Sequence, residues 1–170
     1  MENRKIYSEQ IIGTVGWEIE RKFLVIGDAW RMLAGGHLCR QGYLSIAKER
    51  TVRVRTYRGQ GAITVKGLSR GPRRREYEYP IPLADAEAML DHLCRRPLIE
   101  KNRHRIVCRK LLWEVDEFFG SNEGLIVAEV ELADPFQHVS KPDWIGQEVT
   151  HDPRYFNANL VFNPYQSWPG

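Results

Sequence analysis

Charged residues recur at every second position in several short stretches of this 170-residue chain. In Glu18-Ile19-Glu20-Arg21-Lys22 the even positions carry charge, and in Arg53-Val54-Arg55 two arginines flank a valine. Successive side chains of a β-strand point to opposite faces, so this alternation places charge on one face and apolar residues on the other. The pattern predicts strands over residues 18–25, 37–45, 50–58, 62–66, 73–81, 100–109, 112–118 and 125–132.

The predicted strands are short and are joined by glycine-rich turns such as Arg58-Gly59-Gln60-Gly61, which indicates an antiparallel arrangement. Capping residues and apolar spacing predict helices at the connections, over residues 28–33, 85–93, 134–139 and 153–160. Since eight strands suffice to close a barrel, we expect an α+β, mainly β fold: an eight-stranded antiparallel β-barrel with flanking helices. One domain would span residues 16–170, after a disordered or loosely attached leader at residues 1–15.

The composition is that of an ordinary globular protein, with 42% hydrophobic and 28% charged residues. The three cysteines, Cys39, Cys94 and Cys108, are odd in number and lack metal-ligand spacing, which argues against a disulfide framework. The histidines are scattered along the chain, a distribution more typical of packing roles than of a metal site. No apolar stretch is long enough for a signal peptide or a membrane span, so we expect a cytoplasmic protein without membrane contact.

The charged strand faces are sorted by sign. Acidic residues occupy the faces at 18/20, 76/78, 116 and 129/131, whereas basic residues occupy those at 53/55, 66 and 101/103/105. Taken singly, each face is typical of a sheet surface that meets water. Taken together, the faces indicate a charged interior that needs a compensating ligand, because burying unpaired like charges is costly. A polyanion for the basic residues and metal cations for the carboxylates would meet that need.

Basic residues also concentrate in two segments, 40–75 and 95–110, as they do in proteins that bind nucleic acid. Residues 111–140, however, carry seven Asp or Glu and no Lys or Arg, which binding to nucleic acid would leave unexplained. Among the consecutive arginines at 73–75, only Arg74 has the parity of the charged faces. We therefore expect no nucleic-acid partner.

A series of charged motifs follows Glu18-Ile19-Glu20-Arg21-Lys22 along the chain. In order, these are Arg40-Gln41-Gly42-Tyr43-Leu44, Arg53-Val54-Arg55, Thr64-Val65-Lys66, Arg74-Arg75-Glu76-Tyr77-Glu78, Glu100-Lys101-Asn102-Arg103, Glu114-Val115-Asp116 and Glu129-Val130-Glu131. The first motif matches the ExExK signature of the CYTH superfamily, also called triphosphate tunnel metalloenzymes, and the ordered series resembles that family from about residue 16 to about residue 160. The chain looks closest to compact bacterial members, many of which are inorganic triphosphatases. The resemblance implies an eight-stranded antiparallel barrel that forms a tunnel.

The resemblance also implies roles for the charged residues. Basic residues would bind the substrate phosphates, since arginine forks suit bidentate phosphate contacts; they are Arg40, Arg53, Arg55, Lys66, Arg74, Lys101 and Arg103. Acidic residues would hold two Mg²⁺ or Mn²⁺ ions, because hard cations prefer oxygen ligands; they are Glu18, Glu20, Asp116, Glu129 and Glu131. Supporting roles would fall to Glu76, Glu78 and Arg105.

Two further residues are implied in catalysis by the resemblance, Lys22 and Tyr43, which would pair near the scissile bond. One metal ion would bridge the phosphates while a second activates water for attack on the terminal phosphorus. Arginine neighbours would lower the pKa of Lys22 and let it accept or relay a proton. Two structural alternatives stay open: Tyr43 as a packing aromatic, and Lys22 in an ion pair with Glu18 or Glu20.

The activity implied by the resemblance is metal-dependent hydrolysis of inorganic triphosphate, or tripolyphosphate, to pyrophosphate and phosphate. The alternatives are a class IV-type adenylate cyclase, a thiamine or nucleoside triphosphatase, and a non-catalytic polyphosphate-binding module. The inward carboxylates argue against the last, because a pure polyanion binder has no use for them. Many relatives carry Lys or Arg in the C-terminal helix, yet Tyr155-Phe156-Asn157-Ala158-Asn159 has neither. Residues 161–170 would pack on an end of the barrel or on the partner in a homodimer.

Overall fold

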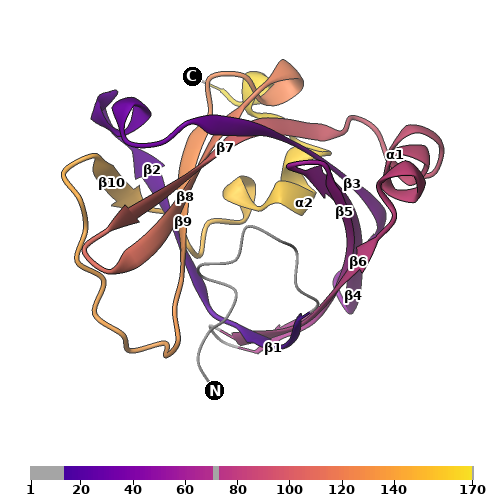
Figure 1. Ribbon diagram of the computed structural model, residues 1–170, viewed down its shortest axis with the longest axis horizontal. Helices are drawn as coiled ribbons and strands as arrows, with labels where there is room; N and C mark the ends of the chain where they lie inside the picture. Colours follow the sequence, from indigo (N-terminus) through magenta and orange to yellow (C-terminus); the bar gives the residue numbers. More distant parts are fainter. Residues whose placement is uncertain (1–13, 71–72, 170) are drawn as a thin grey trace.

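The strand-like segments form one antiparallel sheet in the structure, a computed structural model that describes residues 14–70 and 73–169 (Figure 1). Its strand order is β1-β6-β5-β4-β3-β7-β8-β9-β2-β10. The strands are β1 (Thr14–Glu18), β2 (Glu20–Val25), β3 (Gly36–Ala47), β4 (Arg50–Tyr57), β5 (Gln60–Arg70), β6 (Arg73–Ile81), β7 (Ile99–Cys108), β8 (Leu111–Phe118), β9 (Ile126–Glu131) and β10 (Ile145–Glu148).

The sheet curls into a ring that the first strand of the chain bridges (Figure 1). β1 and β2 are successive parts of this strand, interrupted at Ile19, and they pair with β6 and β9 respectively. Hydrogen bonding between the described strands therefore ends at β1 and at β10, while the chain itself runs across the seam. The mainly antiparallel β architecture agrees with the prediction, but a closed eight-stranded barrel is not confirmed.

One half of the outer face is covered by α1 (Leu83–His92), which packs across β3, β4 and β5. Ala86 and Leu90 of this helix are fully buried against Val54 and Leu44. Val54 alternates with Arg53 and Arg55 along β4, so the packing of valine on the helix turns both arginines to the opposite, inner face.

The other half of the outer face is covered by β10, by the segment before it and by the 3₁₀ helix η1 (Ala29–Met32). Their Trp30 and Trp144 join Phe23 of β2 and Trp113 of β8 in one buried cluster. Burying a large apolar side chain contributes about 1.5–3 kcal/mol. The apolar faces of β2, β7, β8 and β9 thus face outward into this cluster, and their charged faces point inward.

The C-terminal segment packs against one end of the inner face. It consists of η3 (Pro153–Tyr155), α2 (Asn157–Leu160) and η4 (Tyr165–Ser167), and α2 lies within the outline of the ring in Figure 1. Leu160 and Val161 contact the inward side chains of Tyr43, Ile99 and Phe118. This apolar contact separates one end of the charged interior from solvent.

Two predicted helices are present with shifted boundaries. The segment 28–33 forms the short helix η1, in which Asp28 makes no side-chain cap and instead accepts from Arg31 Nε at 3.0 Å. The predicted helix 85–93 begins earlier, at Leu83, directly after Pro82. A proline cannot donate a backbone hydrogen bond, which suits the unpaired first turn of a helix.

Other segments depart from the prediction. The helix over 134–139 is wrong, because Asp134 accepts the N–H of Phe136 at 2.8 Å and fixes a turn instead. The helix over 153–160 divides into η3 and α2 at Phe156, and β10 was not predicted. Residues 1–13 of the expected leader lie outside the described residues, and residues 14 and 15 belong to β1. No helix in the part of the chain described here is long and apolar enough to cross a bilayer.

Candidate active site

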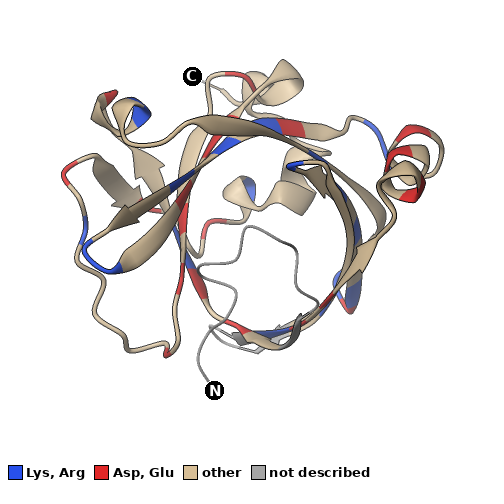
Figure 2. Cartoon of the chain, viewed as in Figure 1, with Lys and Arg blue, Asp and Glu red and all other residues tan. Residues whose placement is uncertain are grey.

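Charged residues occur along the strands all around the ring (Figure 2), and the ion pairs between neighbouring strands bring their side chains together on its inner face. The sheet register produces this arrangement. It places Lys22 opposite Glu129, Arg103 opposite Asp116, and Lys66 opposite Glu76. We call the inner faces of β2, β7, β8 and β9 the first wall, and those of β1, β4, β5 and β6 the second wall.

The first wall holds a tightly bonded group of charges. Arg103 donates from Nε and Nη2 to the two carboxylate oxygens of Asp116, both at 2.7 Å, and it reaches Glu129 at 3.2 Å. Lys101 forms an ion pair with the same aspartate, and the side chains of Lys101 and Asp116 are 0% and 1% exposed. Burial raises the pKa of Asp116, but the two cations outweigh it and keep the pKa below its ordinary value. The aspartate is therefore an ionised link between two buried cations.

Lys22 belongs to the same wall and lies between two carboxylates. Its ammonium is 2.9 Å from Glu20 and forms a second ion pair with Glu129. Burial lowers the pKa of Lys22, but the attraction of Glu129 and Glu20 exceeds that effect and raises the pKa above its ordinary value. The prediction of a lowered pKa is wrong, because carboxylates rather than arginines surround the ammonium. The alternative of an ion pair with Glu20 is confirmed.

On the second wall, Lys66 bridges strands β5, β1 and β6. Its ammonium lies 2.6 Å from Glu18 and 2.8 Å from Glu76. Burial raises the pKa of Glu18 to about 8, and the neighbouring carboxylates of Glu20 and Glu76 add to this effect against the attraction of Lys66. Several carboxyl groups are thus crowded around Glu18, and Lys66 is the cation that pairs with Glu18 and Glu76 there.

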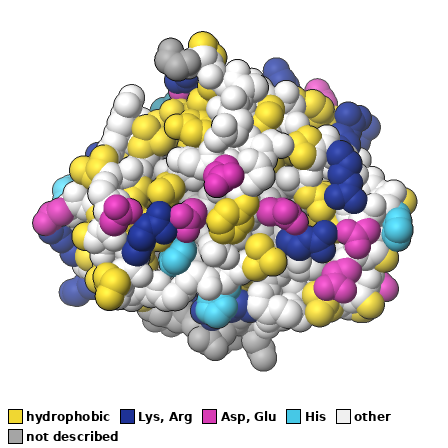
Figure 3. All heavy atoms as spheres, turned by 90° about the horizontal axis from the view of Figure 1, so that it is seen from above, with side chains coloured by type: hydrophobic (Ala, Val, Ile, Leu, Met, Phe, Trp, Pro, Cys, Tyr) yellow, Lys and Arg dark blue, Asp and Glu magenta, His cyan; other side chains and the backbone are white. Residues whose placement is uncertain are grey.

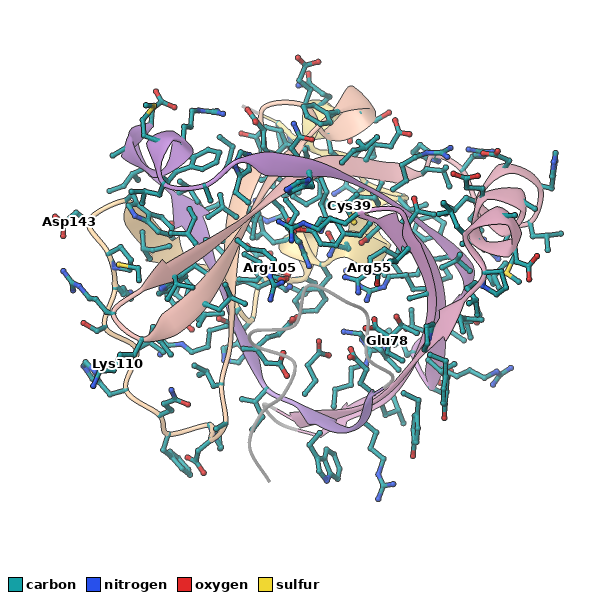
Figure 4. The ribbon with its side chains drawn as sticks, in the orientation of Figure 1. Cys39, Arg55, Glu78, Arg105, Lys110 and Asp143 are labelled. Atoms are coloured by element: carbon teal, nitrogen blue, oxygen red, sulfur yellow. The ribbon has the colours of Figure 1, made fainter. Side chains whose placement is uncertain are left out.

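The arginines of the second wall are held more loosely. Glu78 accepts from Thr64 Oγ1 at 2.9 Å and from Arg55 Nη2 at 3.2 Å, and it lies 3.5 Å from Arg53 Nη2. The Nε atoms of Arg53 and Arg55 are buried and have no hydrogen-bond partner among the described residues. Buried donors of this kind are normally paired, so these two Nε atoms are exceptions that call for an explanation. Figure 4 shows Arg55, Glu78 and Arg105 inside the ring, with Lys110 and Asp143 outside it.

Tyr43 lies on the inner face of β3, where its register partner on β4 is Arg53. Its ring packs against Ile99 and Leu160, and its hydroxyl accepts from Gln41 Nε2 at 3.4 Å. Burial raises the pKa of Tyr43 despite the nearby cations Arg53, Lys66 and Lys22, so the hydroxyl keeps its proton. The ring of Tyr43 therefore packs in the apolar cluster, while its hydroxyl lies near the charged residues of the interior.

Arg40 lies away from the other candidates, on the outer face of β3. It is 3.0 Å from Asp91 of α1 and 3.2 Å from Glu100. Gln41 and Tyr43 are the inward residues of this strand, so alternation turns Arg40 outward. The expected phosphate contact from Arg40 does not fit this placement. Acidic and basic side chains are interspersed on the outer surface seen in Figure 3.

The remaining candidates face inward. Arg74 donates to the carbonyl of Gly67 at 2.6 Å and to Thr51 Oγ1 at 2.8 Å. Arg105 is 3.6 Å from Glu114, and Glu131 lies opposite Glu20 in the register of β2 and β9. Three inward residues escaped prediction, namely Gln41, Thr64 and Glu114. Their parity was the available signal, because each lies two positions from a predicted site residue.

The carboxylates offer the donor chemistry of a divalent-metal site. In residues 14–70 and 73–169, no three His, Cys, Asp or Glu side chains are already grouped to hold a metal ion. However, Glu18 and Glu20 follow each other on one inner face, and Glu129 and Glu131 lie on the strand that pairs with β2. Carboxylate oxygens are what Mg²⁺ and Mn²⁺ prefer. The residue types and their placement fit such an ion.

The described strands thus form a curled antiparallel sheet with apolar faces outside and charges of both signs inside. Residues 17–161 match the CYTH domain family, and the chain belongs to this family.

An inorganic triphosphatase of Acetivibrio thermocellus is 53% identical over 154 residues, which cover 91% of this chain and 99% of that protein. An inorganic triphosphatase of Nitrosomonas europaea is 36% identical, over 86% of this chain and 97% of that one. The crystal structure of an inorganic triphosphatase is similar with a TM-score of 0.61 at 31% identity, covering 90% of this chain and 97% of its own.

Proposed function

We propose that this protein hydrolyses inorganic triphosphate to pyrophosphate and phosphate with the help of a divalent metal ion. Its relatives in two bacteria are inorganic triphosphatases and are matched over nearly their whole length. The observation that carries the proposal is the interior of the ring, where buried arginine Nε donors lie close to crowded carboxylates and have no hydrogen-bond partner among the described residues. Such an interior suits a substrate that is itself a polyanion with bound cations.

The charge balance of the interior supports a metal complex as the substrate. Among the residues that the structure describes, the inner face carries as many carboxyl side chains as cationic ones. The cations are Lys22, Arg53, Arg55, Lys66, Arg74, Lys101, Arg103 and Arg105. The carboxylates are Glu18, Glu20, Glu76, Glu78, Glu114, Asp116, Glu129 and Glu131. A bare triphosphate would therefore meet little net positive charge, whereas divalent cations would both offset its charge and occupy the carboxylates.

We assign the phosphate contacts mainly to the second wall. Arg53 and Arg55 each keep a buried Nε donor that finds no partner in residues 14–70 and 73–169, and Lys66 lies on the neighbouring strand. Planar guanidinium groups give bidentate contacts to phosphate, and the lysine adds a point charge. Arg74, Lys101 and Arg103 are further phosphate candidates, and Glu76, Glu78 and Arg105 support them. Lys101 is buried in an ion pair with Asp116. Lys101 could bind phosphate only if Asp116 left this pair to bind a metal cation instead.

The metal-binding role falls to Glu18, Glu20, Glu129 and Glu131, with Asp116 at the edge of the group. When bound, Mg²⁺ or Mn²⁺ would neutralise phosphate charge and lower the pKa of a water molecule for attack on the terminal phosphorus. The carboxylates would leave their present partners, Lys22, Lys66 and Arg103. Those cations would then turn towards the phosphates, so the two sets of charges exchange partners when the substrate binds.

Lys22 and Tyr43 complete the proposed site. Because its pKa is raised, Lys22 remains an ammonium and stabilises negative charge on the transferring group. The protonated hydroxyl of Tyr43 donates a hydrogen bond near the same position. The ring serves as a tunnel that the C-terminal segment closes at the end nearest Tyr43. We further propose a cytoplasmic location and a homodimeric state, which cell fractionation and analytical ultracentrifugation would test.

Phosphate release from purified protein tests the proposed function. Tripolyphosphate, ATP and thiamine triphosphate are compared with Mg²⁺, with Mn²⁺ and with EDTA. We expect rapid hydrolysis of tripolyphosphate with a metal ion and none with EDTA. Glu20→Gln should abolish turnover while it retains triphosphate binding. An inert tripolyphosphate, or conversion of ATP to cyclic AMP as the main reaction, would overturn the proposal.

A further inference from the structure

The backbone of Lys22 lies where the pairing of β2 with β10 comes to an end. The register of these two strands stops at Glu148, which lies opposite Phe23. The N–H and C=O of Lys22 both face the chain that follows β10. There the N–H of Val149 donates to the carbonyl of Lys22 at 2.8 Å. Val149 thus continues the backbone bonding by one residue after the strand has ended.

The N–H of Lys22 is satisfied differently, by a side chain. It donates to Thr150 Oγ1 at 3.0 Å. The same hydroxyl donates to Glu148 Oε1 at 2.7 Å, and Arg21 Nε holds that carboxylate at 2.8 Å. Thr150 therefore donates its hydroxyl hydrogen to Glu148, which leaves the hydroxyl oxygen to accept the N–H of Lys22.

The connection extends to the other end of the proposed site. Asp152 N–H donates to the carbonyl of Val149 at 3.1 Å, and the chain continues directly into η3 and α2. The C-terminal segment then places Leu160 and Val161 against Tyr43. A short stretch after β10 thus joins the backbone of Lys22 to the element that packs on Tyr43.

We infer that Thr150 is a positioning residue, which holds the backbone of Lys22 so that its ammonium stays between Glu20 and Glu129. The inference rests on the proposed function of Lys22. The hydroxyl acts from outside the charged interior and touches neither substrate nor metal. Its loss leaves the strand in place but frees the one backbone donor that aligns Lys22. A small displacement of a catalytic group can reduce the rate by about a hundredfold.

The test compares Thr150→Val, which has the same shape without the hydroxyl, with Thr150→Ser, which keeps the hydroxyl. Thr56→Val on the outer face of β4 is the matched control. We expect Thr150→Val to lower kcat for tripolyphosphate by about ten- to a hundredfold with KM changed less than about threefold. Thr150→Ser should restore kcat to within about threefold of the wild type. Hydrogen exchange should be faster at the amide of Lys22 in the valine variant.

An unchanged kcat in Thr150→Val, or a serine variant as impaired as the valine variant, would overturn the inference. So would a rise in KM at constant kcat. Circular dichroism establishes that each variant is folded, and Thr150→Ala replaces the valine variant should that one not fold. A wild-type protein without triphosphatase activity would instead contradict the proposed function, so the two failures are distinguishable.

Discussion

The two walls of the interior carry the same types of side chain but bond them differently. On the first wall, Arg103 makes two bonds of 2.7 Å to Asp116, and Lys101 and Asp116 are almost completely enclosed. On the second wall, Arg53 and Arg55 contact Glu78 at 3.5 and 3.2 Å, and their side chains are 14% and 13% exposed. The group around Asp116 is tightly bonded, whereas Arg53 and Arg55 keep Nε donors that have no hydrogen-bond partner among the described residues.

The difference follows from what lies behind each wall. The first wall is backed by the large cluster of Phe23, Trp30, Trp113 and Trp144, which fixes β2, β8 and β9 closely. The second wall is backed by the smaller cluster under α1, and β1 lies at the end of the hydrogen-bonded sheet. Buried charges that are fully paired are costly to separate, so those of the first wall hold one another in place. Charges with unused donors are available to a ligand.

Breaking the first wall should have the largest effect. Asp116→Asn removes the charge that Lys101 and Arg103 share, and it leaves two buried cations without their main partner. Removing one partner of a buried ion pair costs about 3–5 kcal/mol. We expect a loss of that size in the free energy of unfolding, measured in urea, together with loss of activity. Asp143→Asn, at an exposed aspartate, is the control and should leave stability unchanged.

Breaking the second wall should affect activity more than stability. Arg53→Met removes a guanidinium whose Nε has no hydrogen-bond partner in the described part of the chain. Removing one preorganised donor from an active site typically lowers the rate by about 10²–10³-fold. We expect a fall of this size in kcat/KM for tripolyphosphate. If Arg53→Met instead lost as much stability as Asp116→Asn and showed no selective loss of activity, the proposed difference between the two walls would be wrong.

The ion pair of Arg21 and Glu148 on the outside should have a modest, pH-dependent effect. The bond from Arg21 lowers the pKa of Glu148 from its ordinary value of 4.5 to about 2. A lowered folded-state pKa stabilises the protein above the unfolded-state value, and this contribution disappears as the pH falls from 4.5 towards 2. Since Glu148 is 33% exposed, we expect about 1 kcal/mol or less.

Urea unfolding of wild type and Glu148→Gln at pH 6 and pH 3 measures this contribution. The difference in unfolding free energy should be largest at pH 6 and should shrink at pH 3. A difference that stays constant between the two values would show that ionisation of Glu148 does not contribute.

The smallest effect is expected from Arg40, which the family resemblance places among the phosphate ligands but the structure places outside the ring. Arg40→Met removes only partly exposed ion pairs, which contribute about 0–1 kcal/mol. We expect kcat/KM within about twofold of the wild type, since no step of the proposed reaction involves this residue. A tenfold fall would mean that Arg40 reaches the substrate.

Charge alternation in the sequence was enough to predict most strands and the inward face of each. Arg53 and Arg55 on either side of Val54 are an example, because the period of a strand depends only on backbone geometry. The outward position of Arg40 follows from the same rule applied to Tyr43 in the same motif. The turn at residues 134–139 was harder to predict from the sequence, because it depends on a local bond in which the side chain of Asp134 accepts the N–H of Phe136.

The partners of each charge could not be predicted from parity, because they depend on which strands are neighbours. Lys22 has a raised rather than a lowered pKa since β9 brings Glu129 beside it, 107 residues further along the chain. Likewise, the seam between β1 and β2 depends on the interruption at Ile19, for which the alternating pattern gives no signal.

The most direct test of the two walls is a crystal structure with Mn²⁺ and a non-hydrolysable triphosphate analogue. Anomalous scattering locates the manganese, and difference density locates the phosphates. We predict manganese beside Glu18, Glu20, Glu129 and Glu131, with the phosphates against Arg53 and Arg55 of the second wall. Phosphates bound outside the ring, or manganese away from these carboxylates, would contradict the account.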